Sequence, residues 1–310
     1  MLRIVLLISG CLFLLLQQFI YPLSTNTQFI IFLTGIILLG VPHGAADLLV
    51  ATQNADRGMK AFSKIRFLSI YLGRLVLFAA TLWFFPVVGN ILFIFFAAYH
   101  FGETDLHQFK TDTLLGKLFV ISYGLVILSV ILLHHFEDVT PLLLQFESGR
   151  DNIYFVNWIG AHRYHILSVS GMLFFTAAFI YFLKHSQPGN TESGYFLVRF
   201  GVILFILFNL PMLLGFTFYF VVWHSFLSLH NIVSYLRDKS QFGKDTITKQ
   251  ILFYSALAIG GIVVLGSGFM FISTTATMGY LFLSLAVLTA PHMQIMHEMY
   301  YRIRVGVTAK

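Results

Sequence analysis

Long apolar runs separated by short polar segments dominate the chain. A transmembrane helix needs about 20 mainly apolar residues. Ten segments meet or nearly meet this requirement, at residues 4–22, 28–46, 66–85, 87–105, 115–134, 166–184, 196–213, 216–236, 251–273 and 278–299. This pattern predicts an all-α, polytopic membrane bundle of about ten transmembrane helices, with eight as the lower bound. The longest polar segment, residues 135–165, is expected to hold a short interfacial helix or a lid.

Composition agrees with this prediction. Only 10% of the 310 residues are charged and 58% are hydrophobic, whereas soluble domains carry about 25% charged residues. Cys11 is the only cysteine, which excludes a disulfide scaffold. The first run lacks a small-residue cleavage site and is expected to remain as a helix rather than be removed as a signal peptide. Without an evident repeat or linker, residues 1–310 are predicted to form a single integral membrane domain.

The basic residues predict the orientation in the membrane. With a cytoplasmic N-terminus, the inner segments hold sixteen of the nineteen Lys and Arg residues, namely Arg3, Arg57, Lys60, Lys64, Arg66, Lys110, Lys117, Lys184, Arg199, Arg237, Lys239, Lys244, Lys249, Arg302, Arg304 and Lys310. Cytoplasmic loops of membrane proteins are enriched in these residues. We therefore expect a multi-pass protein of the cell inner membrane with both termini cytoplasmic. The net charge of +6 then reflects topology and gives no support for a nucleic-acid partner.

Histidines recur in four apolar runs. His43, His100, His224 and His292 lie in the second, fourth, eighth and tenth runs, all of which cross from outside to inside in this topology. Ionisable side chains at membrane depth are costly and usually mark functional sites. A lone intramembrane histidine is often a structural hydrogen-bonding group, but four on separate parallel helices favour one shared site.

The side chains around these histidines suggest a metal centre. Imidazoles without thiolates suit iron, zinc or copper, and a histidine-rich non-haem iron centre fits best. Asp47 follows His43 by four residues, so on a continuous helix its carboxylate would accept the second ring N–H of His43. Glu103 shares a helix face with His100, and Asp105 points elsewhere.

Aromatic residues accompany the histidine runs. Most of the 35 phenylalanines are expected to face lipid or to pack. Four aromatic residues close to the histidines are predicted to line an apolar substrate tunnel, namely Phe96, Tyr99, Tyr219 and Trp223.

Four short motifs resemble a known family. The runs VPHGAAD at 41–47, YHFGETD at 99–105, WHS at 223–225 and PHM at 291–293 are similar to those of the Brp/Blh family of membrane-bound beta-carotene 15,15'-dioxygenases. The resemblance implies an Fe(2+) enzyme that uses O₂ to split the central double bond of beta-carotene into two all-trans-retinal molecules, which supply a rhodopsin. It also implies that no acid/base residue acts beyond the metal ligands.

The resemblance implies that His43, His100 and His224 are iron ligands. Beside it, we expect the carboxylates of Asp47, Glu103 and Asp105 to orient the ligands rather than to react themselves. Many family members have another histidine one turn after the WHS motif, where this chain has Ser228. His292 in the PHM motif is the first choice for a fourth ligand and His230 the second.

Two other classes compete with this assignment. One is another histidine-rich membrane oxidoreductase, such as a bis-histidine haem protein, which would show a Soret band. The other is a non-enzymatic carotenoid- or retinal-binding or transport protein, which would not need a metal. Neither a di-iron histidine box nor an inverted repeat is evident in the sequence.

Overall fold

The protein is a helical bundle in all parts that the structure describes. The computed structural model describes residues 1–57, 61–144, 150–185, 191–238, 243–270 and 277–308, and these contain no β-strand. In chain order, with η marking π-helical segments, the elements are α1 (Leu2–Leu15), η1 (Leu16–Ile20), α2 (Thr25–Gly35), η2 (Ile36–Gly40), α3 (Val41–Ala45), α4 (Asp47–Arg57), α5 (Lys64–Phe84), α6 (Pro86–Leu106), α7 (Leu114–Ser129), η3 (Val130–His134), α8 (Phe136–Leu144), α9 (Arg150–His185), α10 (Thr191–Asn209), α11 (Met212–Phe216), η4 (Thr217–Ser225), α12 (Phe226–Arg237), α13 (Lys244–Met270) and α14 (Thr277–Thr308).

Eight helical spans within the described residues are long and apolar enough to cross a membrane. They are Leu2–Ile20, Thr25–Asp56, Lys64–Phe84, Pro86–Leu106, Leu114–His134, Asn152–His185, Met212–Arg237 and Asp245–Val263. The shorter apolar helix Gly194–Asn209 and α14 occupy the two remaining predicted positions. The predicted all-α, multi-pass bundle is therefore confirmed, at its lower bound of eight spans by this criterion. Residues 271–273, together with Lys60, Lys239 and Lys310, lie outside the described residues.

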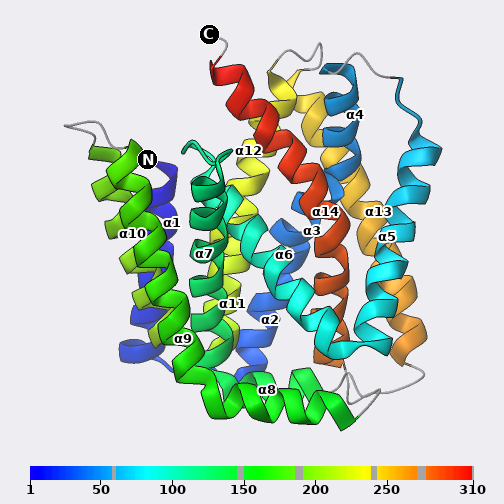
Figure 1. Ribbon diagram of the computed structural model, residues 1–310. Coiled ribbons are helices and arrows are strands. Elements are labelled where there is room, and N and C mark those ends of the chain that lie inside the picture. The colour runs from blue at the N-terminus through cyan, green and yellow to red at the C-terminus, as the bar shows by residue number, and fades with distance from the viewer. Residues whose placement is uncertain (58–60, 145–149, 186–190, 239–242, 271–276, 309–310) are drawn as a thin grey trace.

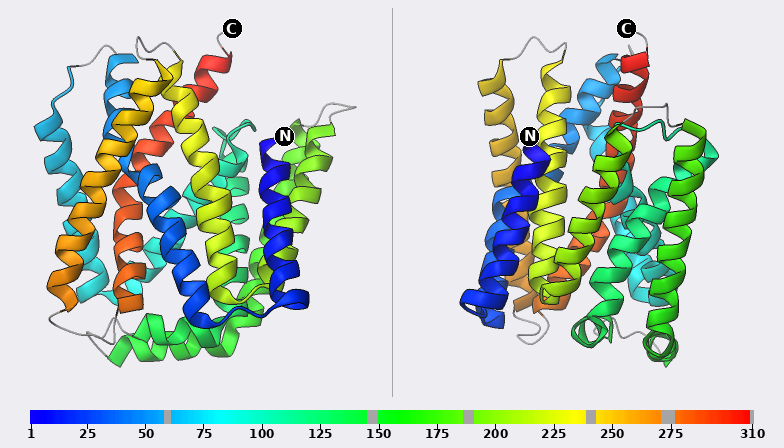
Figure 2. Two further views of the ribbon diagram at one scale, coloured as in Figure 1. Left: turned by 180° about the vertical axis from the view of Figure 1, so that it is seen from behind. Right: turned by 90° about the vertical axis from the view of Figure 1, so that its left-hand side faces the viewer.

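Both chain termini lie at one end of the bundle, and α8 runs across the opposite end (Figures 1 and 2). Arg3 donates to Gln108 Oε1 at 3.0 Å, and Arg304 donates to Asp112 Oδ1 at 3.2 Å. Arg3 and Arg304, which the charge pattern predicts for the inner side, thus share this end of the structure. We call it the basic end.

The four histidine-bearing runs follow the direction that the sequence predicts. The run from α2 to α4, helix α6, the run from α11 to α12, and helix α14 each begin near the α8 end and finish toward the basic end (Figure 1). Parallel helices bring residues of similar depth to the same level of the bundle, which is the condition for a shared site.

Two glycines allow α6 and α7 to pack backbone against backbone. A Cβ atom on Gly102 would overlap the carbonyl oxygen of Val120, and one on Gly124 would overlap that of Ala98. Because the obstructing atoms belong to the main chain, no rotamer change would relieve the overlap. This contact therefore fixes the position of α6, which carries His100.

The polar segment between the fifth and sixth apolar runs is mostly helical. Helix α8 is the predicted short helix, whereas α9 begins at Arg150 and continues unbroken to His185. An ion pair between Arg163 and Glu137 joins α9 to α8 and lowers the pKa of the Glu137 carboxyl. The apolar side of α8, including Phe136 and Val139, is buried against the bundle.

Candidate metal centre

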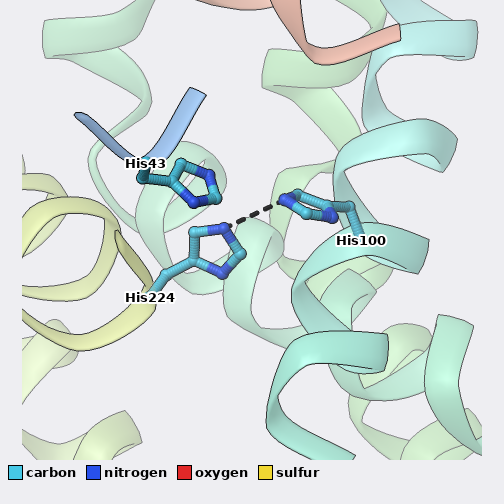
Figure 3. Close-up of side chains that lie close together, drawn as sticks. All are labelled: His43, His100 and His224. Atoms are coloured by element: carbon cyan, nitrogen blue, oxygen red, sulfur yellow. Dashed lines mark hydrogen bonds between the residues drawn. The ribbon is translucent and has the colours of Figure 1, made fainter. Parts of the chain in front are cut away.

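Three imidazole rings from distant parts of the sequence meet in the interior of the bundle. His43 comes from α3, His100 from α6 and His224 from η4, and their rings point toward one another (Figure 3). One ring nitrogen from each lies within 4.8 Å of the others. The Nε2 atoms of His100 and His224 are 3.1 Å apart. All three side chains are buried.

His292 on α14 adds a fourth ring. Its centroid is 4.3 Å from that of His43 and 4.9 Å from that of His100. Its Nδ1 lies 2.7 Å from Oδ1 of Asp47, and the Tyr71 hydroxyl donates to the other Asp47 oxygen at 3.0 Å. A carboxylate on one ring nitrogen fixes the tautomer and directs the other nitrogen to a metal.

The buried nitrogens fit a metal ion. Nε2 of His292, the ring nitrogen that Asp47 leaves free, is buried without a hydrogen-bond partner among the described residues. Unpaired buried polar atoms are costly and call for an explanation. Two nitrogen ligands, each about 2.1 Å from one ion, lie about 3 Å apart when they subtend a right angle, which agrees with the separation of the His100 and His224 Nε2 atoms. The donor set is all nitrogen, which suits iron, zinc or copper rather than calcium or magnesium.

Irregular helical segments carry or precede two of these histidines, His43 and His224. Pro42 lacks an N–H and clashes with the preceding turn, and the segment before it, η2, is π-helical. His224 lies near the end of η4, a nine-residue π-helical segment. Such π-helical segments are rare in proteins, and those that occur are often found at functional sites. In contrast, α14 continues through Pro291 without interruption.

The expected pairing of Asp47 with His43 is corrected by the structure. Helix α3 ends at Ala45, and α4 begins at Asp47 after a turn at Ala46. This break removes the four-residue helical register, and Asp47 contacts His292 rather than His43. Asp47 still contacts a histidine of the cluster, but one that is 245 positions away.

Asp105 is a buried acceptor that joins three helical segments. It accepts hydrogen bonds from the hydroxyls of Tyr123 at 2.6 Å and Tyr219 at 3.1 Å and from the indole N–H of Trp223 at 3.0 Å. Trp223 immediately precedes His224. The carboxylate therefore ties α6 and α7 to η4 and holds the backbone that carries His224, without contacting a histidine ring itself.

Replacement of Asp105 by asparagine is expected to lower thermal stability. One amide oxygen cannot replace two carboxylate oxygens that accept from three donors, and each buried donor left unpaired costs about 1–3 kcal/mol. Thermal unfolding in detergent should show a midpoint several degrees below that of the wild type. Asp112→Asn is the matched control, because Asp112 is half exposed at the basic end and should shift the midpoint much less. Equal midpoints for the two variants would contradict this role.

Glu103 belongs to a separate polar cluster nearer the basic end. Its Oε1 lies 2.7 Å from His297 Nδ1 and 3.4 Å from Nη2 of Arg304 and the Tyr99 hydroxyl. Glu103 thus contacts none of the four clustered histidines. The sequence offers no local signal for the contact between Glu103 and His297, whose side chain is 44% exposed.

The remaining histidines lie away from the cluster. His230 is exposed on α12. His107 Nδ1 donates to the backbone carbonyl of Thr104 at 2.7 Å, and burial lowers the pKa of His107 to about 4. The ring of His134 stacks on Phe208, with centroids 3.8 Å apart.

An apolar cavity extends to α8 from two aromatic side chains that pack against His224, and none of the four clustered histidines is among its lining residues. Phe101 and Phe220 form part of its wall, and their ring centroids lie 4.7 Å and 6.0 Å from that of His224. At the other end the cavity is lined by Phe136, Val139 and other residues of α8, and only Asn90 and Thr289 among its lining residues have polar side chains.

The four predicted tunnel residues lie in two different places, and none of them lines the apolar cavity. Phe96 and Tyr99 line a second groove, together with residues of α5 and α14. Tyr219 and Trp223 line neither this groove nor the apolar cavity, because their polar atoms are held by Asp105. The aromatic lining of the apolar cavity comes instead from side chains such as Phe93, Phe101, Phe216 and Phe220.

Comparison with known proteins identifies relatives of this chain. The family model described as beta-carotene 15,15'-dioxygenase matches residues 34–300, which include all four clustered histidines. A protein named beta-carotene 15,15'-dioxygenase, from uncultured marine bacterium 66A03, is 24% identical over 260 residues, which cover 83% of this chain and 89% of the relative. No solved structure matches the chain.

Proposed function

The chain belongs to the beta-carotene 15,15'-dioxygenase family, and from this premise we propose that it splits the central double bond of beta-carotene with O₂ to give two all-trans-retinal molecules. The observation that carries the proposal is the four-histidine cluster, which packs against the Phe101 and Phe220 wall of an apolar cavity. A carotene has no polar group, so it must be selected by shape and apolar contact. In this proposal the enzyme works in the inner membrane, with both termini cytoplasmic, and supplies retinal to a rhodopsin.

The proposed metal is Fe(2+), held by His43, His100, His224 and His292. When bound, iron supplies the redox chemistry that lets O₂ react with a polyene. The histidines provide neutral nitrogen donors, and Asp47 keeps the proton of His292 on Nδ1, so that Nε2 carries the free lone pair. Asp105 does not contact the metal ligands but binds Trp223, the residue before His224, and so holds His224 in position.

The apolar cavity positions the polyene and keeps water away. Phe101 and Phe220 form a continuous path of ring contacts from the cavity wall to His224. Exclusion of water suppresses side reactions of reactive species. These rings would therefore protect the double bond of the carotene at which cleavage takes place. The exposed apolar side chains of the outer helices place the protein where a lipid-dissolved substrate is found.

Expression in a carotene-producing bacterium tests the proposal. Chromatography should show loss of beta-carotene and appearance of retinal with the wild type, and neither change with His43→Ala. Carotene that is retained or bound without retinal, in a well-expressed protein, would overturn the proposal in favour of a binding or transport protein. A Soret band in the purified protein would favour a haem enzyme instead.

Filling the apolar cavity is expected to abolish cleavage without loss of metal. Leu283 on α14 lines the cavity and is partly buried, so Leu283→Trp should block the polyene and lower retinal production at least tenfold. Bound iron, measured by plasma emission spectrometry, should be unchanged. Leu288→Trp on the same helix is the control, because Leu288 is 37% exposed and lines neither cavity. Full activity in Leu283→Trp would show that substrate binds elsewhere.

A further inference from the structure

A second groove lies between α5, α6 and α14, close to the start of α7. Its polar side chains include Arg74, Lys117, Gln294 and His297, and its apolar wall includes Leu77 and Phe96. Phe96 lies one turn before His100 on α6, so the groove runs beside the histidine cluster. Nothing in the proposed reaction requires basic residues here.

Arg74 is a cation at membrane depth without a carboxylate partner. It lies ten positions after the first residue of α5, which places its Cα about 15 Å along the helix axis. Its Nη1 contacts Oε1 of Gln294, and no carboxylate lies within ion-pair distance of it among the described residues. A charged group at this depth is costly unless its charge is compensated.

Lys117 brings a second uncompensated cation to the same groove. It is exposed near the beginning of α7 and has no ion pair within the part of the chain that the structure describes. The third basic group, His297, already shares a hydrogen bond with Glu103. Two positive charges therefore remain for a ligand.

We propose that this groove binds one anionic phospholipid of the inner leaflet. Its phosphate would meet Arg74 and Lys117, because guanidinium groups bind phosphate oxygens in bidentate fashion. An acyl chain would lie along Leu77, Leu92 and Phe96. Helical side chains lean toward the N-terminus of their helix, so Arg74 reaches toward the Lys64 end of α5, where anionic lipid attracts basic residues. The apolar wall favours a lipid over a soluble anion, and the proposal does not depend on the proposed reaction.

Lipid retention by the intact purified protein tests this site. Native mass spectrometry of protein extracted in mild detergent should show one retained phosphatidylglycerol, and Arg74→Gln and Lys117→Gln should each reduce its occupancy at least fivefold. Arg74→Lys should retain part of it. Arg66→Gln is the matched control, since Arg66 is an exposed basic residue on α5 that does not line the groove.

Adding lipids or phosphate to delipidated protein distinguishes an anionic phospholipid from other possible ligands. Titration of delipidated protein with phosphatidylglycerol should restore the complex, whereas phosphatidylcholine and inorganic phosphate should not. Equal retention in the wild type and both glutamine variants, an equal loss in Arg66→Gln, or equal binding of phosphatidylcholine or free phosphate would overturn the proposal. Because mass is the readout, the outcome is independent of carotene cleavage.

Discussion

Replacement of His224 by alanine is expected to remove both bound iron and retinal production. Its ring centroid lies 4.7 Å from that of His100 and 5.3 Å from that of His43. Loss of one of four neutral nitrogen donors leaves a site that holds iron weakly, because the Asp47 carboxylate beside the cluster is already engaged by His292 and Tyr71. Iron should fall from about one per chain to near zero, and cleavage should fall at least 100-fold.

His230→Ala is the matched control for this experiment. His230 lies six positions later, is exposed on α12 and is the alternative fourth ligand that the sequence suggested. Iron content and activity should remain those of the wild type. If His230→Ala loses iron while His224→Ala keeps it, the proposed ligand set is wrong. Circular dichroism of both variants establishes that the helices still form.

Replacement of Asp47 by alanine is expected to weaken iron binding without abolishing it. The carboxylate holds Nδ1 of His292 at 2.7 Å, and loss of such a partner typically costs 10–100-fold in metal affinity or activity. Competition with a chelator should show this weaker affinity. Excess ferrous iron should restore cleavage in Asp47→Ala but not in His224→Ala, which distinguishes a positioning residue from a ligand.

Asp56→Ala controls for general disturbance of α4, since Asp56 is exposed on the same helix. It should leave iron affinity unchanged. Tyr71→Phe should have a smaller effect than Asp47→Ala, because it removes only the hydrogen bond to Oδ2 of the carboxylate. Wild-type iron affinity in Asp47→Ala would refute the role given to this residue.

Much of the fold could be predicted from the sequence because hydrophobic length and basic charge act locally. Each apolar run indicates one helix. The basic residues indicate the orientation, and Arg3 and Arg304 lie at the same end of the bundle. Helix α9 shows the limit of this reasoning. Its first turns contain Arg150, Asn152 and other polar residues, so hydropathy detects the helix only from about residue 166 although it begins at Arg150.

The membership of the histidine cluster could be predicted, but its hydrogen bonds could not. Parallel runs of similar depth bring His43 and His292 together, and this follows from topology. The pairing of Asp47 with His292 depends instead on the turn at Ala46 and on the rotation of α14, and neither has a local signature. The same holds for Asp105, which contacts residues 18, 114 and 118 positions away.

The order of the histidines along the chain has a consequence for biogenesis. The cluster draws on α3, α6, η4 and α14, so its first and last histidines are 249 positions apart in the sequence. While the segments from α3 to α13 are synthesised and inserted, His292 is absent and Asp47 lacks its histidine. The complete cluster arises only after α14 has been inserted, so a metal cannot be loaded into all four histidines before that helix has been made.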